Sequence, residues 1–209
     1  KYSITNKKEG ILYFQKAIDN NCCHAMFKFG ILLMEGKVGK NKNKKEGVKL
    51  IKMAADAEYP KALYYYSQML KKGSYVTKNK EASLLYLKKS AFKGHIEAML
   101  NYGIHLLDSK NSDIKKSIIF IKKACDAGNL EAMYYYSFII DNGTDEIPSD
   151  PKQSARLMKI SANNNILDAN IVYGAKLYEG KGVDIDKEAA FKYFKISADQ
   201  GDSNAIFYI

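Results

Sequence analysis

The chain has 209 residues, of which 46% are apolar and 27% are charged, so it can form a folded core and is not expected to be disordered. Its apolar runs are too short for a membrane-spanning helix. The net charge is +10, but only one of the 33 basic residues, Arg156, is an arginine. Because arginine supplies the forked contacts that read bases, we expect no specific nucleic-acid recognition. The first residue is Lys1, which favours a fragment of a longer protein.

Cysteines are sparse, because Cys22 and Cys23 are adjacent and Cys125 stands alone. This pattern is not a disulfide framework, and it favours a cytoplasmic protein. The triplet Asn142-Gly143-Thr144 matches a glycosylation acceptor and keeps the secretory-pathway lumen as an alternative. Consecutive residues such as Cys22, Cys23 and His24 do not converge easily on one ion, so we predict neither a metal site nor a cofactor.

In chain order, the sequence shows one unit repeated about every 36 residues. Each unit opens with Asn or Asp, which are preferred residues at the N-cap of a helix. A small residue follows four positions later and a large apolar residue eight positions later, so the first helix of each unit has a closely packing stripe. The predicted N-caps are Asn6, Asn43, Asn79, Asp113, Asp150 and Asp186.

A second helix follows each first helix. The residue fifteen positions after the cap is Gly or Asn, with Glu58 as the exception, which predicts a left-handed turn at the end of the first helix. An alanine four residues later opens the second helix. A Gly or Ser lies five residues after it, as at Gly30, Gly103 and Gly174; because an interior Gly costs ~1 kcal/mol, we predict a close backbone contact there. The alanines are Ala25, Ala62, Ala98, Ala132, Ala169 and Ala205.

These elements predict an all-α fold, an α/α superhelix (solenoid) of antiparallel helix pairs with about 36 residues per repeat. A leading outer helix spans 6–21, and a further inner helix starts within 202–209. Because no polar helix caps the last repeat, we expect end-to-end self-association through the C-terminal repeat. The five repeats between these ends are 22–58, 59–94, 95–128, 129–165 and 166–201.

The segment Ala169–Val183, with Gly180 and Gly182 in its loop, continues through Asp186–Ala190 to Ile196–Gly201. These residues resemble the Sel1-like repeat, a relative of the tetratricopeptide repeat, and the resemblance covers essentially the whole chain. It implies a non-enzymatic adaptor, with no catalytic residues, that binds a protein partner. Two alternatives are a regulatory repeat module of a larger enzyme and a part of a secretory-pathway quality-control complex.

The candidate binding surface is a second stripe on the inner helices, at positions two, six and nine after each alanine. At about 100° per residue this stripe lies well away from the buried one, and resemblance to the tetratricopeptide repeat places it in the concave groove. Its aromatic content favours a site for a peptide or helix of a partner. The alternative is that adjacent inner helices bury these residues. The candidates are Phe27, Ile31, Met34, Tyr64, Gln68, Lys71, Leu100, Ile104, Tyr134, Phe138, Ile171 and Tyr178.

Two other functions are weighed against this one. The outer helices carry many lysines, which would allow docking on an acidic surface with a strong salt dependence. Catalysis is not expected, because His95 lies in a turn between helices, His105 has no obvious carboxylate partner, and Ser67 and Ser137 occupy packing positions. The outer-helix lysines are Lys44, Lys45, Lys49, Lys52, Lys88, Lys89, Lys93, Lys115, Lys116, Lys122 and Lys123.

Overall fold

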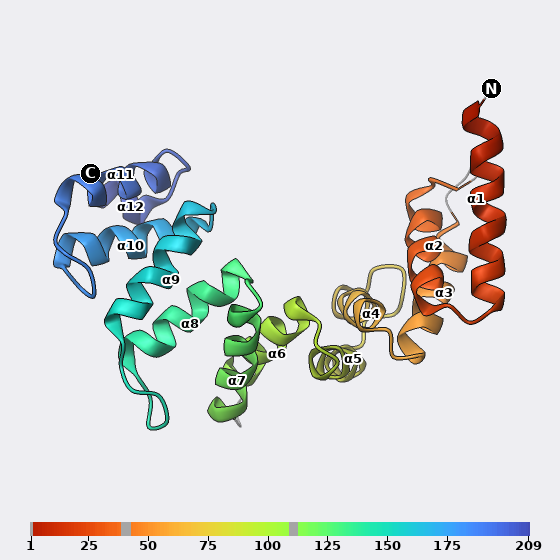
Figure 1. Cartoon of the computed structure of the whole chain (residues 1–209), viewed down its shortest axis with the longest axis horizontal. Helices are drawn as coiled ribbons and strands as arrows, with labels where there is room; N and C mark the ends of the chain where they lie inside the picture. The colour runs from red at the N-terminus through yellow and green to blue at the C-terminus, as the bar shows by residue number, and fades with distance from the viewer. Residues whose placement is uncertain (1, 39–42, 109–112) are drawn as a thin grey trace. The chain divides into compact units, whose positions relative to one another are not determined.

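The computed structural model describes residues 2–38, 43–108 and 113–209, without the side chains of 2–7 and 207, and these residues form α-helices joined by turns (Figure 1). The chain packs as two compact units, which we call unit 1 (residues up to Tyr102) and unit 2 (residues from Gly103). The helices are α1 (Tyr2–Asp19), α2 (Cys23–Glu35), α3 (Lys44–Asp56), α4 (Pro60–Lys72), α5 (Lys80–Phe92), α6 (Ile96–Asp108), α7 (Ile114–Asp126), α8 (Leu130–Asn142), α9 (Pro151–Asn163), α10 (Leu167–Glu179), α11 (Lys187–Ala198) and α12 (Ser203–Phe207). The odd-numbered helices are the predicted outer helices, and the even-numbered helices are the predicted inner ones.

The predicted N-caps set the start of every odd-numbered helix from α3 to α11. The Oδ1 atom of Asn43 accepts a hydrogen bond from the backbone N–H of Glu46 at 3.1 Å, and Asp186 accepts one from Ala189 at 2.8 Å. Asn79, Asp113 and Asp150 cap their helices in the same way. The prediction for Asn6 is wrong, because α1 already begins at Tyr2 and no helix-breaking residue precedes Asn6.

The predicted left-handed turns also form. Positive φ angles occur at all six positions, from 57° at Asn21 to 87° at Gly94 and Gly201. Glu58 adopts a φ of 58° although it is neither Gly nor Asn, and its carboxylate pairs with Lys93 at 2.6 Å. Each even-numbered helix begins two residues before its repeat alanine, and these alanines are buried. Their small side chains therefore let neighbouring helices approach closely.

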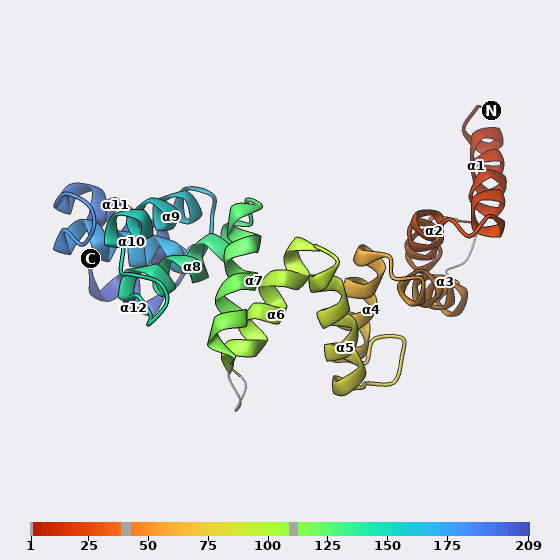
Figure 2. The same ribbon diagram turned by 60° about the horizontal axis from the view of Figure 1, so that its bottom comes forward.

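The even-numbered helices α2, α4, α8 and α10 each pack against the odd-numbered helix that follows (Figure 2). The predicted close contacts lie at these crossings. A Cβ atom on Gly30 would lie 2.8 Å from the carbonyl oxygen of Gly47, and one on Gly174 would lie 2.7 Å from the ring of Phe194. The Ser83 hydroxyl donates a hydrogen bond to the carbonyl of Ser67 at 2.8 Å, so polar small residues serve the same crossing.

Candidate functional site

The twelve candidate residues all lie on even-numbered helices, but three of them do not reach the surface. Phe27 is 7% exposed, Met34 is 9% exposed and Leu100 is 1% exposed. The prediction that these three face a groove is therefore wrong, because neighbouring elements cover them; the ring of Phe27, for example, lies against Tyr59.

The other nine candidates have accessible surface. Lys71, Phe138 and Tyr178 are exposed, whereas Ile31, Tyr64, Gln68, Ile104, Tyr134 and Ile171 are half-buried. Ile31, Tyr64, Gln68 and Lys71 belong to unit 1, and the other five belong to unit 2. The accessible candidates therefore form one group in each unit.

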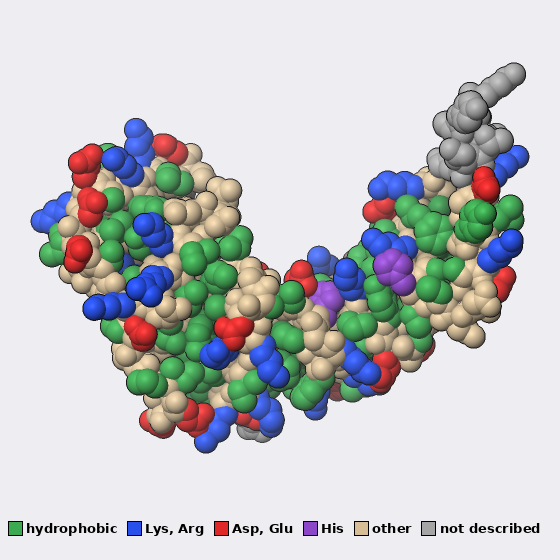
Figure 3. Space-filling model, viewed as in Figure 1, with side chains coloured by type: hydrophobic (Ala, Val, Ile, Leu, Met, Phe, Trp, Pro, Cys, Tyr) green, Lys and Arg blue, Asp and Glu red, His purple; other side chains and the backbone are tan. Residues whose placement is uncertain are grey.

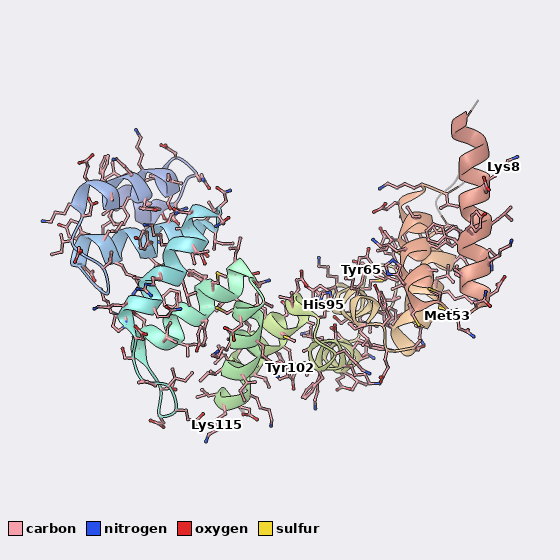
Figure 4. All side chains as sticks on the ribbon, viewed as in Figure 1. Lys8, Met53, Tyr65, His95, Tyr102 and Lys115 are labelled. Atoms are coloured by element: carbon pink, nitrogen blue, oxygen red, sulfur yellow. The ribbon has the colours of Figure 1, made fainter. Side chains whose placement is uncertain are left out.

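In unit 1, aromatic side chains and two histidines form two sets of ring contacts that meet at the neighbouring residues Tyr64 and Tyr65, and we call them together the unit 1 cluster. Tyr64 stacks on His95 with 4.8 Å between ring centroids, and the Nδ1 atom of His24 lies 2.9 Å from the hydroxyl of Tyr59. Figure 3 shows histidine and hydrophobic side chains next to one another on this face of unit 1, and Figure 4 shows Tyr65 and His95 on the same side of it. The members are His24, Phe27, Tyr59, Tyr64, Tyr65 and His95.

The repeat itself builds this cluster. Tyr59 is the N-cap residue of α4, and His95 directly precedes α6 in the same register. Each packs on the side chain two residues after the alanine of the preceding even-numbered helix, Phe27 in one case and Tyr64 in the other. Sequence reasoning missed Tyr59 and His95 as members of the surface, although both stand three residues before a repeat alanine and an alignment of that position would have shown them.

Polar contacts hold Tyr64 in place. The side-chain amide of Asn101 donates hydrogen bonds to the Tyr64 hydroxyl at 3.2 Å and to the carbonyl of Glu97 at 2.7 Å. His95 has a carboxylate neighbour, because its Nδ1 atom lies 3.2 Å from Glu97. Burial lowers the pKa of His95 despite the opposing effect of Glu97, which favours a neutral ring at neutral pH.

In unit 2, three aromatic residues of α8 form a second set, which we call the unit 2 cluster: Tyr134, Tyr135 and Phe138. The ring of Tyr134 makes edge contacts with Tyr135 at 5.4 Å and with Phe138 at 5.0 Å. Burial raises the pKa of both tyrosines, so their hydroxyls stay protonated and can donate hydrogen bonds. Ile171 of α10 belongs to the same hydrophobic core as Tyr134.

Most lysines of the predicted outer face are engaged in ion pairs. Lys52 pairs with Asp56 at 2.6 Å, Lys122 pairs with Asp126 at 2.9 Å and Lys93 pairs with Glu58 at 2.6 Å. Lys49, Lys89, Lys115 and Lys116 also pair with carboxylates. These pairs reduce the positive field that the face presents to an acidic partner.

Other kinds of site receive little support from the described residues. Within them, no group of three or more His, Cys, Asp and Glu side chains is placed to hold a metal ion. No helix in the same ranges is long and apolar enough to cross a bilayer. The three cysteines are free thiols, and burial raises the pKa of Cys125 to about 11, which makes it a poor nucleophile.

The family model for the Sel1 repeat matches six consecutive segments that together span nearly the whole chain. The matched residues are 3–22, 23–59, 60–95, 96–129, 130–166 and 168–202. The comparison with curated proteins finds no match.

Solved structures agree on the fold. A Sel1 repeat protein from Oxalobacter formigenes superposes with a TM-score of 0.75 at 18% identity, over 93% of this chain and 84% of that one. A protective antigen of uropathogenic Escherichia coli with an SLR fold gives 0.73 at 21% identity, over 94% of this chain and 46% of the antigen. The cysteine-rich protein B of Helicobacter pylori gives 0.51 at 19% identity, over 63% of this chain and 98% of that one. At these identities the likeness concerns the fold alone.

Proposed function

The chain belongs to the Sel1 repeat family, and on that premise we propose that it is a protein-interaction scaffold whose even-numbered helices bind a segment of a partner protein. Sel1 repeats are a scaffold type and are generally non-enzymatic. The observation that carries the proposal is the pair of aromatic clusters, one in each unit, whose tyrosines are accessible and yet held by neighbouring side chains. A segment of the partner, as a peptide or a helix, is the ligand that suits such a helix face.

The physical state of these rings supports the proposal. Tyrosine offers a large contact area with few rotatable bonds, so its ordering on binding costs little conformational entropy. Tyr64 is already ordered by the stacked ring of His95 and by the amide of Asn101. Part of the entropy cost is therefore met in the folded protein before a partner arrives.

Apolar side chains are also exposed on the odd-numbered helices, and they serve as the matched control. Leu85, Phe92 and Phe191 are exposed there, at three different positions of the repeat. Scattered apolar residues are ordinary on protein surfaces and do not define a site. We therefore expect their substitution to leave partner binding unchanged.

The test is affinity capture from the lysate of the source cells with three baits. One bait is the wild type, the second carries Tyr65→Ser, Phe138→Ser and Tyr178→Ser, and the third carries Leu85→Ser, Phe92→Ser and Phe191→Ser. Circular dichroism first establishes that all three baits are folded. We expect the partner to be captured by the first and third baits and lost from the second.

Two results would contradict the proposal. Capture of the same proteins by all three baits would mean that the accessible aromatic residues of the even-numbered helices do not bind. Proteins that the second bait still captures and that moderate salt then releases would instead assign binding to the lysines of the odd-numbered helices.

A further inference from the structure

The sequence Tyr-Tyr-Tyr-Ser occurs twice, at Tyr64–Ser67 on α4 and at Tyr134–Ser137 on α8, at the same register of the repeat. The last tyrosine and the serine are buried in both copies, whereas the first two tyrosines contribute to the surface. The two copies therefore present the same aromatic pair on two helices that differ in charge.

In unit 1, the helix that carries the tyrosine pair is basic. The cationic residues of α4 are Lys61, Lys71 and Lys72, all of them exposed, and α4 has no acidic residue. Lys61 is close enough to His95 to lower the pKa of its ring, after the larger effect of burial. The unit 1 tyrosines are also partly covered, because His95 stacks on Tyr64.

In unit 2, the surroundings are acidic. Asp108, Glu131 and Asp168 are exposed, and all three carboxylates are close enough to Tyr135 to add to the effect of burial on its pKa. Within the described ranges none of these carboxylates forms an ion pair. The sequence of α8 contains no lysine or arginine, and the one lysine of α10, Lys176, is buried against Asp141 at 2.6 Å.

We propose that the unit 2 cluster, with Asp108, Glu131 and Asp168 around it, binds a lysine- or arginine-containing segment of a partner protein. The inference rests on the proposed scaffold function and names the chemistry of the segment. An ammonium or guanidinium group over a tyrosine ring is attracted by the ring's electrons, and the flanking carboxylates attract the same charge. Phe138, which is 38% exposed, offers an apolar contact beside them.

The charge of the whole chain makes this surface selective. Because the net charge is +10, most of the protein repels a cationic segment. Such a segment is attracted only where exposed carboxylates form no ion pair with a lysine or arginine of the chain. Repulsion elsewhere fixes where such a partner binds, which is a common source of specificity. The same argument disfavours nucleic acid or an anionic lipid surface at the unit 2 cluster.

The experiment measures the fluorescence anisotropy of a short labelled peptide in which lysine alternates with leucine. The comparison peptide has glutamate in place of every lysine. Both peptides are titrated with the wild type, with Glu131→Gln/Asp168→Asn and with a matched control, Glu81→Gln/Glu188→Gln. Each double variant removes two acidic residues from the first turns of two helices, so the change in net charge is the same, although Glu188→Gln also removes an exposed ion pair with Lys192.

We expect the lysine peptide to bind the wild type and the control equally. It should bind Glu131→Gln/Asp168→Asn about tenfold more weakly, and its binding to the wild type should weaken as salt is added. We expect no binding of the glutamate peptide. The inference is overturned if the lysine peptide does not bind the wild type, if both peptides bind alike, or if the two double variants bind the lysine peptide equally. None of these failures touches the scaffold proposal, which is decided by the capture experiment with the aromatic variants.

Discussion

A buried ion pair in unit 2 yields the sharpest stability prediction. Lys176 of α10 is 5% exposed at its side chain, and its Nζ atom lies 2.6 Å from Asp141 Oδ1 of α8. The second oxygen of Asp141 accepts a hydrogen bond from Lys181, which is half exposed, also at 2.6 Å. The two partners therefore differ in what their removal leaves behind.

Removing the carboxylate is the costly change. Asp141→Ala leaves the Lys176 ammonium buried without a counter-charge, and the loss of one partner of a buried pair costs about 3–5 kcal/mol. Lys176→Met leaves Asp141 with Lys181 and with partial access to water, so we expect a cost of about 1 kcal/mol. The double variant Asp141→Leu/Lys176→Met replaces the pair with apolar side chains and should unfold within about 1 kcal/mol of the wild type.

Urea unfolding, followed by circular dichroism, measures these differences, with a fit that allows the two units to unfold separately. The reasoning would be refuted if Asp141→Ala and Lys176→Met cost the same, or if the double variant were as unstable as Asp141→Ala. Either result would mean that the burial of an unpaired ammonium does not determine the cost of Asp141→Ala.

The pH dependence of stability gives an independent check on the same pair. Burial alone would raise the pKa of Asp141, but the hydrogen bonds from Lys176 and Lys181 outweigh burial and lower the pKa. A carboxyl whose pKa is lowered on folding stabilises the protein above its unfolded pKa, and the stabilisation is lost as pH falls through the folded pKa. We therefore expect the acid loss of stability to be smaller in the double variant than in the wild type.

Three further predictions concern other parts of the chain. In the same urea assay, Gly30→Ala should destabilise unit 1 by about 1–3 kcal/mol, because a Cβ atom there meets the neighbouring backbone. Gly10→Ala should be neutral or stabilising by up to about 1 kcal/mol, because Gly10 has open space around it. The exposed Cys22 should react with a thiol reagent under native conditions much faster than buried Cys125, and equal rates would show that burial does not protect Cys125. End-to-end self-association stays a prediction: the mass found by sedimentation should rise with concentration and fall back to that of a monomer in Ile209→Asp, and a constant monomer mass in the wild type would exclude it.

Local signals were sufficient to predict most of the helical architecture. An N-cap such as Asn43 is recognised from its neighbours in sequence, and its hydrogen bond joins residues that are three apart. Glu58 is the exception to the Gly or Asn pattern, yet it adopts a φ of 58°, so the left-handed turn forms there without the residue type that favours it. The prediction that the first helix starts at Asn6 was wrong for a local reason as well. The residues before Asn6 also favour helix, so the helix begins earlier, at Tyr2.

The surface could be predicted only in part. Leu100 and Phe138 belong to the same predicted stripe, yet one is 1% exposed and the other is 38% exposed. Their difference depends on what packs on each side chain from the neighbouring repeats. The contribution of His95 to the unit 1 cluster was missed for the same reason, because its contact with Tyr64 joins two different repeats.

The sequence by itself therefore determined the repeat, the helix ends and the buried alanines, because these follow from interactions within one turn or one helix pair. Only the tertiary structure decided which stripe residues reach the surface and which charges are paired. Lys176 is one lysine among many in the sequence, and its burial against Asp141 depends on a residue 35 positions away on another even-numbered helix. Such contacts depend on the distance and solvent access between neighbouring repeats, which the pattern of a single repeat does not contain.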